Sequence, residues 1–142
     1  MDKESIYKVL QVNNQINELT RVAGFLEKLG EEWGFPMTLI LSLNLVLEEA
    51  LTNIILYGFD DERTHTIEIC FNKNGDKLSI TIIDDGHVYD PTLKAEPDIT
   101  LSSEERPVGG LGIFLIKKIM DKVEYKRKMD KNYLTLSKNI GS

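Results

Sequence analysis

The sequence has little cysteine and little histidine, which excludes several classes of site. Cys70 is the one cysteine in 142 residues, so a disulfide framework is excluded. Its alternating surroundings at residues 66–71 indicate a packed strand residue, and we expect a reducing compartment. His65 and His87 are the two histidines, and neither has a cysteine or histidine at the spacing of a zinc site. A serine–histidine–aspartate triad has no support either.

Positive charge and long apolar runs are also scarce. The chain has 17 lysines and arginines against 23 aspartates and glutamates, a net charge of −6, which argues against a nucleic-acid-binding surface. No apolar stretch approaches the roughly 20 residues that cross a bilayer, so we expect a cytoplasmic protein without a membrane segment. The Gly-x(4)-Gly-Lys-Ser/Thr pattern of a P-loop is absent. We expect one domain over residues 1–142.

Hydrophobic periodicity predicts strands and helices along the whole chain. A strand is expected at residues 6–12, followed by an amphipathic helix that Asn14 caps and Gly30 ends. The remaining expected elements are a long apolar helix at 38–57 ended by Gly58, hairpin strands at 66–72 and 77–84 around an Asn-Gly turn, a helix at 111–121, and strands at 123–129 and 133–138 turning through 130–132. Residues 86–110 carry turn formers and charges without periodicity, which is typical of a lid or binding loop.

A carboxylate and an amide lie four residues apart in the apolar helix expected at residues 38–57. They are Glu49 and Asn53 of the segment Glu-Ala-Leu-Thr-Asn, so their side chains share one helix face about one turn apart. The amide oxygen can ligate Mg²⁺ that bridges phosphates, and the carboxylate can orient or deprotonate an attacking group. Taken alone, such a pair is more often the solvated edge of an amphipathic helix.

An acidic pair and a glycine follow the apolar strand at residues 78–83. Asp84 emerges at the strand end, where it can accept a hydrogen bond from an adenine amino group. Gly86 would let the backbone approach the base without a Cβ atom in the way. Taken alone, the Asp-Gly sequence is more often an ordinary turn, but here no strand follows promptly to complete a hairpin.

Three glycines open the helix expected at residues 111–121. Gly109, Gly110 and Gly112, with Leu111 between them, leave amide N–H groups free to cradle phosphate oxygens at a helix start. The other interpretation is a loop end whose glycines permit close packing on the sheet. The order of the three motifs, metal-ligand helix, adenine motif and glycine motif, makes ATP chemistry the leading hypothesis.

These three motifs resemble those of the ATPase superfamily that includes gyrase, histidine kinases and mismatch-repair proteins. The short length and the motif details most resemble the bacterial anti-sigma factor serine kinases of partner-switching pathways. The resemblance implies an α/β (α+β) two-layer sandwich with helices on one face of a mixed, largely antiparallel sheet. It also implies that residues 86–110 form an ATP lid.

The resemblance further implies a role for each motif residue. Glu49 would be the general base, Asn53 the magnesium ligand and Asp84 the adenine contact. The other cofactor-binding residues implied are Gly86, Arg106, Gly109, Gly110, Leu111 and Gly112. The implied function is an ATP- and Mg²⁺-dependent serine/threonine kinase that phosphorylates an anti-sigma factor antagonist and binds a sigma factor, with a homodimer possible.

Three positions depart from the pattern of these kinases. Tyr57 stands where many of them have histidine before the glycine, and His87 follows Gly86 without the second glycine of the wider superfamily. The expected basic residue is present only as Arg106, which Pro107, Val108 and Gly109 separate from Gly110. Two alternatives therefore stay open: a nucleotide-dependent partner-binding module without catalysis, and an isolated histidine-kinase ATP-binding module.

Overall fold

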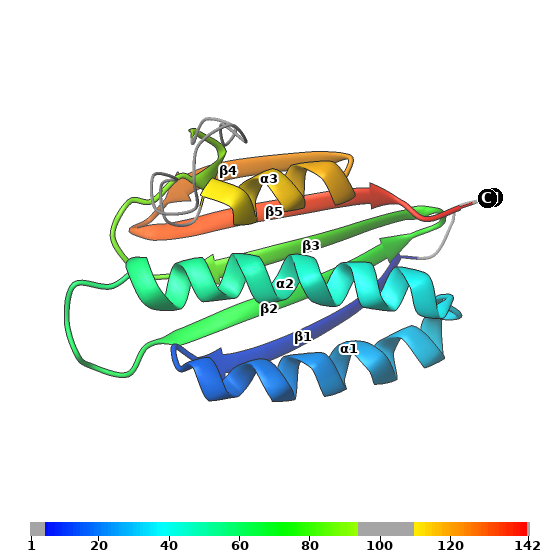
Figure 1. Ribbon diagram of the computed structural model, residues 1–142, viewed down its shortest axis with the longest axis horizontal. Helices are drawn as coiled ribbons and strands as arrows, with labels where there is room; N and C mark the ends of the chain where they lie inside the picture. The colour runs from blue at the N-terminus through cyan, green and yellow to red at the C-terminus, as the bar shows by residue number, and fades with distance from the viewer. Residues whose placement is uncertain (1–4, 94–109, 142) are drawn as a thin grey trace.

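The computed structural model describes residues 5–93 and 110–141, and these form one sheet with helices along it (Figure 1). In chain order the elements are β1 (Ser5–Asn13), the 3-10 helix η1 (Ile16–Glu18), α1 (Leu19–Trp33), α2 (Met37–Tyr57), β2 (Thr66–Asn74), β3 (Lys77–Asp84), the 3-10 helix η2 (Pro91–Leu93), α3 (Gly110–Ile119), β4 (Lys122–Lys128) and β5 (Lys131–Asn139).

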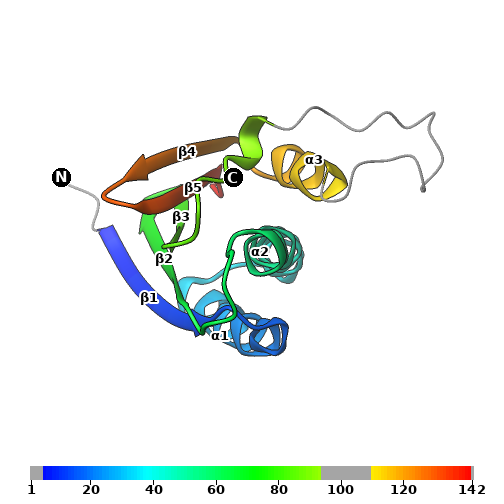
Figure 2. The ribbon, with the colours of Figure 1, turned by 90° about the vertical axis from the view of Figure 1, so that its left-hand side faces the viewer.

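The sheet has five strands in the order β1-β2-β3-β5-β4. Each neighbouring pair is antiparallel, so the expected mixed sheet is wrong for the described strands. Figure 2 shows the three α-helices on one side of this sheet. The predicted two-layer sandwich with helices on one face is therefore confirmed.

The core lies between the sheet and α2. Alternate residues of β3 face the helices, and Leu78, Ile80 and Ile82 are fully buried there. Leu43, Leu47 and Leu51 of α2, at four-residue spacing, are fully buried as well. The period-two apolar pattern of β3 and the helical apolar pattern of α2 both face this core, which is why the sequence predicted both elements. The buried hydrophobic residues form one cluster. This supports the expected single domain, which stays a prediction.

α2 corrects the expectation that no segment is long and apolar enough to cross a bilayer. Met37–Tyr57 meets that requirement by length and composition. Over its most apolar 18 residues, 44% are buried within the protein. Its apolar character is explained by its place in the core, where it contacts both α1 and α3.

The boundaries of α1 differ from the prediction at both ends. Gly30 does not end the helix, which continues to Trp33 and ends at Gly34 with φ 73°. Gly30 is buried inside the helix, where a Cβ atom would lie 2.5 Å from Cδ1 of Ile40. Asn14 does not cap the helix either; its Oδ1 accepts a hydrogen bond from the backbone N–H of His65 at 2.8 Å. A tertiary contact therefore took the place of the local cap.

Both predicted hairpins are present. In the first turn Gly75 has the expected positive φ, 64°, but Asn74 is the last residue of β2 and does not, so glycine alone supplies the predicted conformation. The second turn uses Met129 and Asp130, with φ of 52° and 63°, one residue earlier than the predicted turn at 130–132. Cys70 is buried in β2 without a disulfide partner, so its prediction as a packed strand residue is confirmed.

Two glycines of α1 make a matched test of this packing. At Gly24 an added Cβ atom meets nothing within 4 Å, so Gly24→Ala should raise the free energy of unfolding by roughly 0.5–1 kcal/mol through helix propensity. Gly30→Ala gains the same propensity but must displace Ile40. We expect it to be about 1–3 kcal/mol less stable than Gly24→Ala in urea unfolding. Equal stability of the two variants would contradict the observed contact of α1 with α2.

Candidate functional site

The helix motif and the glycine motif lie against each other. Asn53 of α2 is buried and Glu49, one turn earlier, is half-buried. Opposite them is Gly112 of α3, where an added Cβ atom would lie 2.7 Å from Glu49 Oε2 and 3.5 Å from Asn53 Nδ2. A side chain at residue 112 would therefore displace the Glu49 carboxylate from its present position. Two motifs about 60 residues apart in sequence thus make one site.

Asp84 ends β3 and is buried, with 5% of its surface exposed. Its Oδ1 accepts hydrogen bonds from the backbone N–H of Gly86 at 2.9 Å and from Nδ2 of Asn132 at 3.0 Å. Burial raises the pKa of the Asp84 carboxyl, and these two hydrogen bonds oppose the rise because they favour the ionised form. Asp84 is thus held in one orientation at the predicted adenine position.

A cavity connects Asp84 to Asn53. It is lined by Ala50, Asn53, Ile54, Asp84, Tyr89, Pro91, Ile116, Tyr125, Asn132 and Leu134. Apolar walls with a few convergent polar groups are typical of a small-molecule site. The free volume is about 20 Å³, room for about one water molecule. An adenine ring can enter only if the surrounding side chains move apart.

The structure gives a reason for glycine at residue 86 in addition to the one predicted. A Cβ atom there would overlap the carbonyl oxygen of Gly58, which ends α2. The next residue, His87, donates its backbone N–H to the same oxygen at 3.0 Å. The close approach that the structure shows is to the end of α2, and the predicted approach to the base stays a prediction. This close approach joins the adenine motif to the end of the helix that carries Glu49 and Asn53.

The remaining predicted residues are only partly described. Gly110 and Leu111 begin α3, as expected for a glycine motif at a helix start. Arg106 and Gly109 lie outside the described residues, and so does most of the lid predicted at residues 86–110. The described part of that segment ends with η2.

The sequence analysis missed three side chains of the C-terminal hairpin. Asn132 pairs directly with Asp84 in the β3–β5 register and is 4% exposed. Tyr125 and Arg127 of β4 both donate hydrogen bonds to Asn132 Oδ1. A signal existed, because Asn132 occupies an inward position that alternates with the buried Leu134 and Leu136. Its partner could not be identified without the register.

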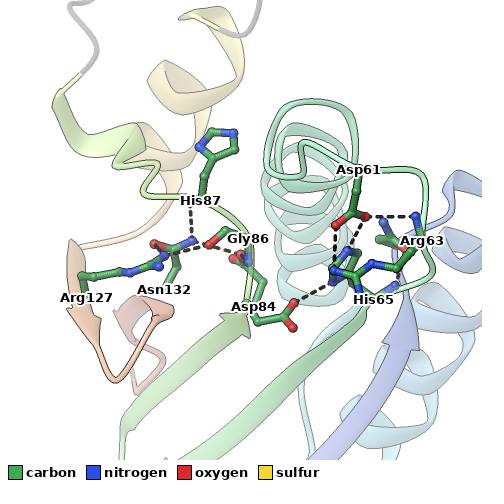
Figure 3. A network of polar contacts seen from close by, with 10 residues as sticks. Asp61, Arg63, His65, Asp84, Gly86, His87, Arg127 and Asn132 are labelled. Atoms are coloured by element: carbon green, nitrogen blue, oxygen red, sulfur yellow. Dashed lines mark hydrogen bonds and ion pairs between the residues drawn. The ribbon is translucent and has the colours of Figure 1, made fainter.

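His65 lies between two carboxylates beside the adenine motif (Figure 3). Its Nε2 is 2.7 Å from Asp61 Oδ1 and its Nδ1 is 3.0 Å from Asp85 Oδ1, and the ring stacks on Phe59. Only the imidazolium can donate to both carboxylates at once. The hydrogen bond with Asp61, supported by Asp85, raises the pKa of His65 above its usual 6.5.

His87, which directly follows the adenine motif, connects that motif to the end of α2. Its ring nitrogens lie 3.0 Å from the carbonyl oxygen of Val88 and 2.7 Å from that of Tyr57, at the end of α2. The hydrogen bonds to these two carbonyls raise the pKa of His87, and the charges of Asp60 and Asp84 add to the rise. Tyr57 stands where many of the kinases it resembles have histidine. It contributes its backbone carbonyl to this contact with His87, and the residue is 41% exposed.

These contacts predict that thermal stability falls as the pH rises from about 6 to 8. Both histidines have folded-state pKa values above 6.5, so their stabilisation is complete below that pH and is lost as each deprotonates. In the double variant His65→Gln, His87→Gln the fall in Tm over this range should be smaller than in the parent. A parallel fall in both proteins would show that the histidines do not contribute.

Sequence comparison finds relatives that are named protein kinases. Serine/threonine-protein kinase BtrW of Bordetella bronchiseptica is 31% identical over 96 residues, covering 68% of this chain and 68% of that protein. Serine-protein kinase RsbW of Listeria monocytogenes is 34% identical over 95 residues, covering 64% of this chain. The match spans only 60% of RsbW.

Solved structures share the fold at low sequence identity. The RsbU and RsbW domains of Rv1364c from Mycobacterium tuberculosis match with a TM-score of 0.64 and 14% identity, over 94% of this chain and 32% of that one. The histidine kinase domain of Erythrobacter litoralis EL346 matches with a TM-score of 0.52 and 15% identity, over 88% of this chain and 60% of that one. The pattern of the histidine kinase-like ATPase domain matches residues 12–138, and the chain belongs to this family.

Proposed function

We propose that this protein is an ATP-dependent protein serine/threonine kinase that phosphorylates an anti-sigma factor antagonist and itself binds a sigma factor. The observation that carries the proposal is the contact of Gly112 with Glu49 and Asn53, beside a cavity that also contains Asp84. The Asn53 amide and the buried Asp84 carboxylate line the cavity, and the Glu49 carboxylate and the start of α3 lie next to Asn53. Phosphoryl transfer needs mainly such positioning and charge neutralisation.

The donor groups suit a magnesium–nucleotide complex. Asn53 and Glu49 offer oxygen ligands, which Mg²⁺ prefers. The described residues hold no cluster of three or more His, Cys, Asp or Glu that would form a complete metal cage. That agrees with Mg²⁺, which commonly binds through one or two side chains together with phosphates and water. When bound, it would neutralise charge on the phosphates next to Asn53.

The proposed reaction transfers the γ-phosphoryl group of ATP to a serine or threonine hydroxyl. Asp84 accepts a hydrogen bond from the adenine amino group, and the backbone N–H groups at the start of α3 face the phosphates. Glu49 accepts the hydroxyl proton while the oxygen of the partner attacks the γ-phosphorus. The new O–P bond replaces the bond to the β-phosphate oxygen, and ADP leaves.

The relatives support the choice of a protein substrate. BtrW and RsbW are named serine or serine/threonine kinases, and this chain matches 68% of BtrW and 60% of RsbW. We therefore assign the phosphate acceptor to a protein rather than to a small molecule. The proposed setting is the cytoplasm, with the sigma factor and the antagonist as alternating partners.

Asn53→Ala should abolish magnesium-dependent ATP binding and leave the fold intact. The substitution removes the amide ligand, while the apolar stripe that holds α2 in the core stays unchanged. Calorimetric titration of ATP with and without magnesium measures this, and circular dichroism checks the fold. Equal metal-dependent affinity of parent and variant would remove Asn53 from the site.

Glu49→Gln should keep ATP affinity within a few-fold and lower phosphoryl transfer by roughly two to four orders of magnitude. Gln keeps the size of Glu beside Gly112, so the change isolates proton acceptance. The matched control is Glu48→Gln, because Glu48 is exposed and lines a hollow beside Leu19 and Thr20 of α1. The measurement is the intact mass of an anti-sigma factor antagonist protein after incubation with this protein, ATP and magnesium.

Three results would contradict the assignment. Parental rates in Glu49→Gln would show that Glu49 is not the base. A parent that binds ATP but adds no phosphate to the antagonist would make a partner-binding module without catalysis the better interpretation. An acid-labile product would instead indicate phosphohistidine and the histidine-kinase alternative.

A further inference from the structure

Asn132 is the centre of a buried hydrogen-bond network behind the adenine-motif carboxylate (Figure 3). Its Nδ2 donates to Asp84 Oδ1 at 3.0 Å and to the backbone oxygen of His87 at 2.8 Å. Its Oδ1 accepts from the hydroxyl of Tyr125 and from a guanidinium nitrogen of Arg127 at 3.1 Å. One side chain of β5 thus joins the end of β3, the segment after it, and β4.

This network determines the orientation of the Asn132 amide. An amide has two N–H donors and one oxygen with two acceptor positions, and here each has a partner. A flipped amide would direct its oxygen at Asp84 and at a carbonyl oxygen, and its N–H groups at two donors. Only one orientation satisfies the site, so Asn132 always offers a donor to Asp84.

The network also determines which atom of Asp84 a ligand meets. Arg127 donates to the backbone oxygen of Gly86 at 2.8 Å, which holds the turn whose N–H donates to Asp84 Oδ1. Oδ1 therefore has two donors, from Gly86 and from Asn132. Among the described residues no hydrogen bond reaches Oδ2, and Asp84 lines the cavity. Oδ2 is therefore the Asp84 oxygen left to accept a hydrogen bond from a ligand, while Oδ1 already accepts two.

We propose that Asn132 is a positioning residue for base selection: it holds Asp84 as an ionised acceptor that favours a purine with a 6-amino group over one with a 6-carbonyl group. An amino group donates to the carboxylate, whereas a carbonyl oxygen would face it with two acceptors in contact. The inference rests on the proposed binding of ATP in this cavity. It assigns base selectivity to the C-terminal hairpin, outside the three motifs.

The probe pair is ATP and ITP, in which a carbonyl replaces the 6-amino group. Asn132→Asp keeps the side-chain size but places a second carboxylate beside Asp84, so that the pair shares a proton and can donate to a carbonyl. We expect the ratio of ATP to ITP affinity to fall about tenfold or more, the scale of a lost charged hydrogen bond. The matched control is Asn139→Asp, the same change at an exposed position of β5, which should keep the parental ratio.

A second variant avoids any change at the cavity wall. Arg127 is not among the lining residues, so Arg127→Met alters base selection without changing the cavity wall: it removes the hydrogen bonds to Asn132 and to the Gly86 carbonyl, and a positive charge that favours ionised Asp84. We expect the affinity ratio to fall several-fold in Arg127→Met and to recover in part in Arg127→Lys, which retains a donor. Tm measured without nucleotide separates this effect from unfolding.

The outcomes separate this inference from the proposed function. A parental ATP-to-ITP ratio in Arg127→Met, or in a folded Asn132→Asp, overturns the role of Asn132 while ATP binding by the parent stands. If Asn132→Asp does not fold, Arg127→Met with its lysine rescue decides. A parent that binds neither nucleotide overturns both this inference and the proposed site.

Discussion

The packing of α2 against the inner face of the sheet is the constraint on which the rest of the structure depends. Its buried leucines, from Leu43 to Leu51, face fully buried strand residues, and burying side chains of this size contributes about 1.5–3 kcal/mol each. The same packing fixes the rotation of the helix about its axis. Glu49 and Asn53 therefore lie at the margin of the core, where α3 brings Gly112 against them. The geometry of the site follows from apolar burial.

The polar groups of the site are held by contacts between distant parts of the chain. The end of α2 meets the adenine motif where Gly58 accepts a hydrogen bond from His87 and where Gly86 has no room for a side chain. The C-terminal hairpin meets the same motif through Asn132. A buried carboxylate such as Asp84 is tolerated because these donors satisfy it. Each contact adds stability and also limits how the carboxylate can point.

Much of the fold could be predicted from the sequence because its signals are local. The Asn-Gly turn at Gly75 and the four-residue spacing of Glu49 and Asn53 depend on nearby residues alone. The failures involve partners that are distant in sequence. Gly30 stays helical because Ile40 packs against it, and Asn14 binds the backbone of His65. Asn132 was missed because its role depends on the β3–β5 register, which a single sequence does not show.

The cavity is small, and its walls are of two kinds that differ in how easily they can move. Asn53, Asp84 and Asn132 belong to α2, β3 and β5, regular elements whose backbone hydrogen bonds and packing oppose movement. Tyr89 and Pro91 belong to the described segment after β3, residues 85–93, in which the short η2 is the only regular structure. Widening the cavity by moving that segment leaves the sheet ladders and the core contacts of α2 in place, whereas moving the other walls would break them. Entry of the proposed base would therefore be cheapest along the segment that leads from the adenine motif, while the groups that would read the base stay where the core holds them.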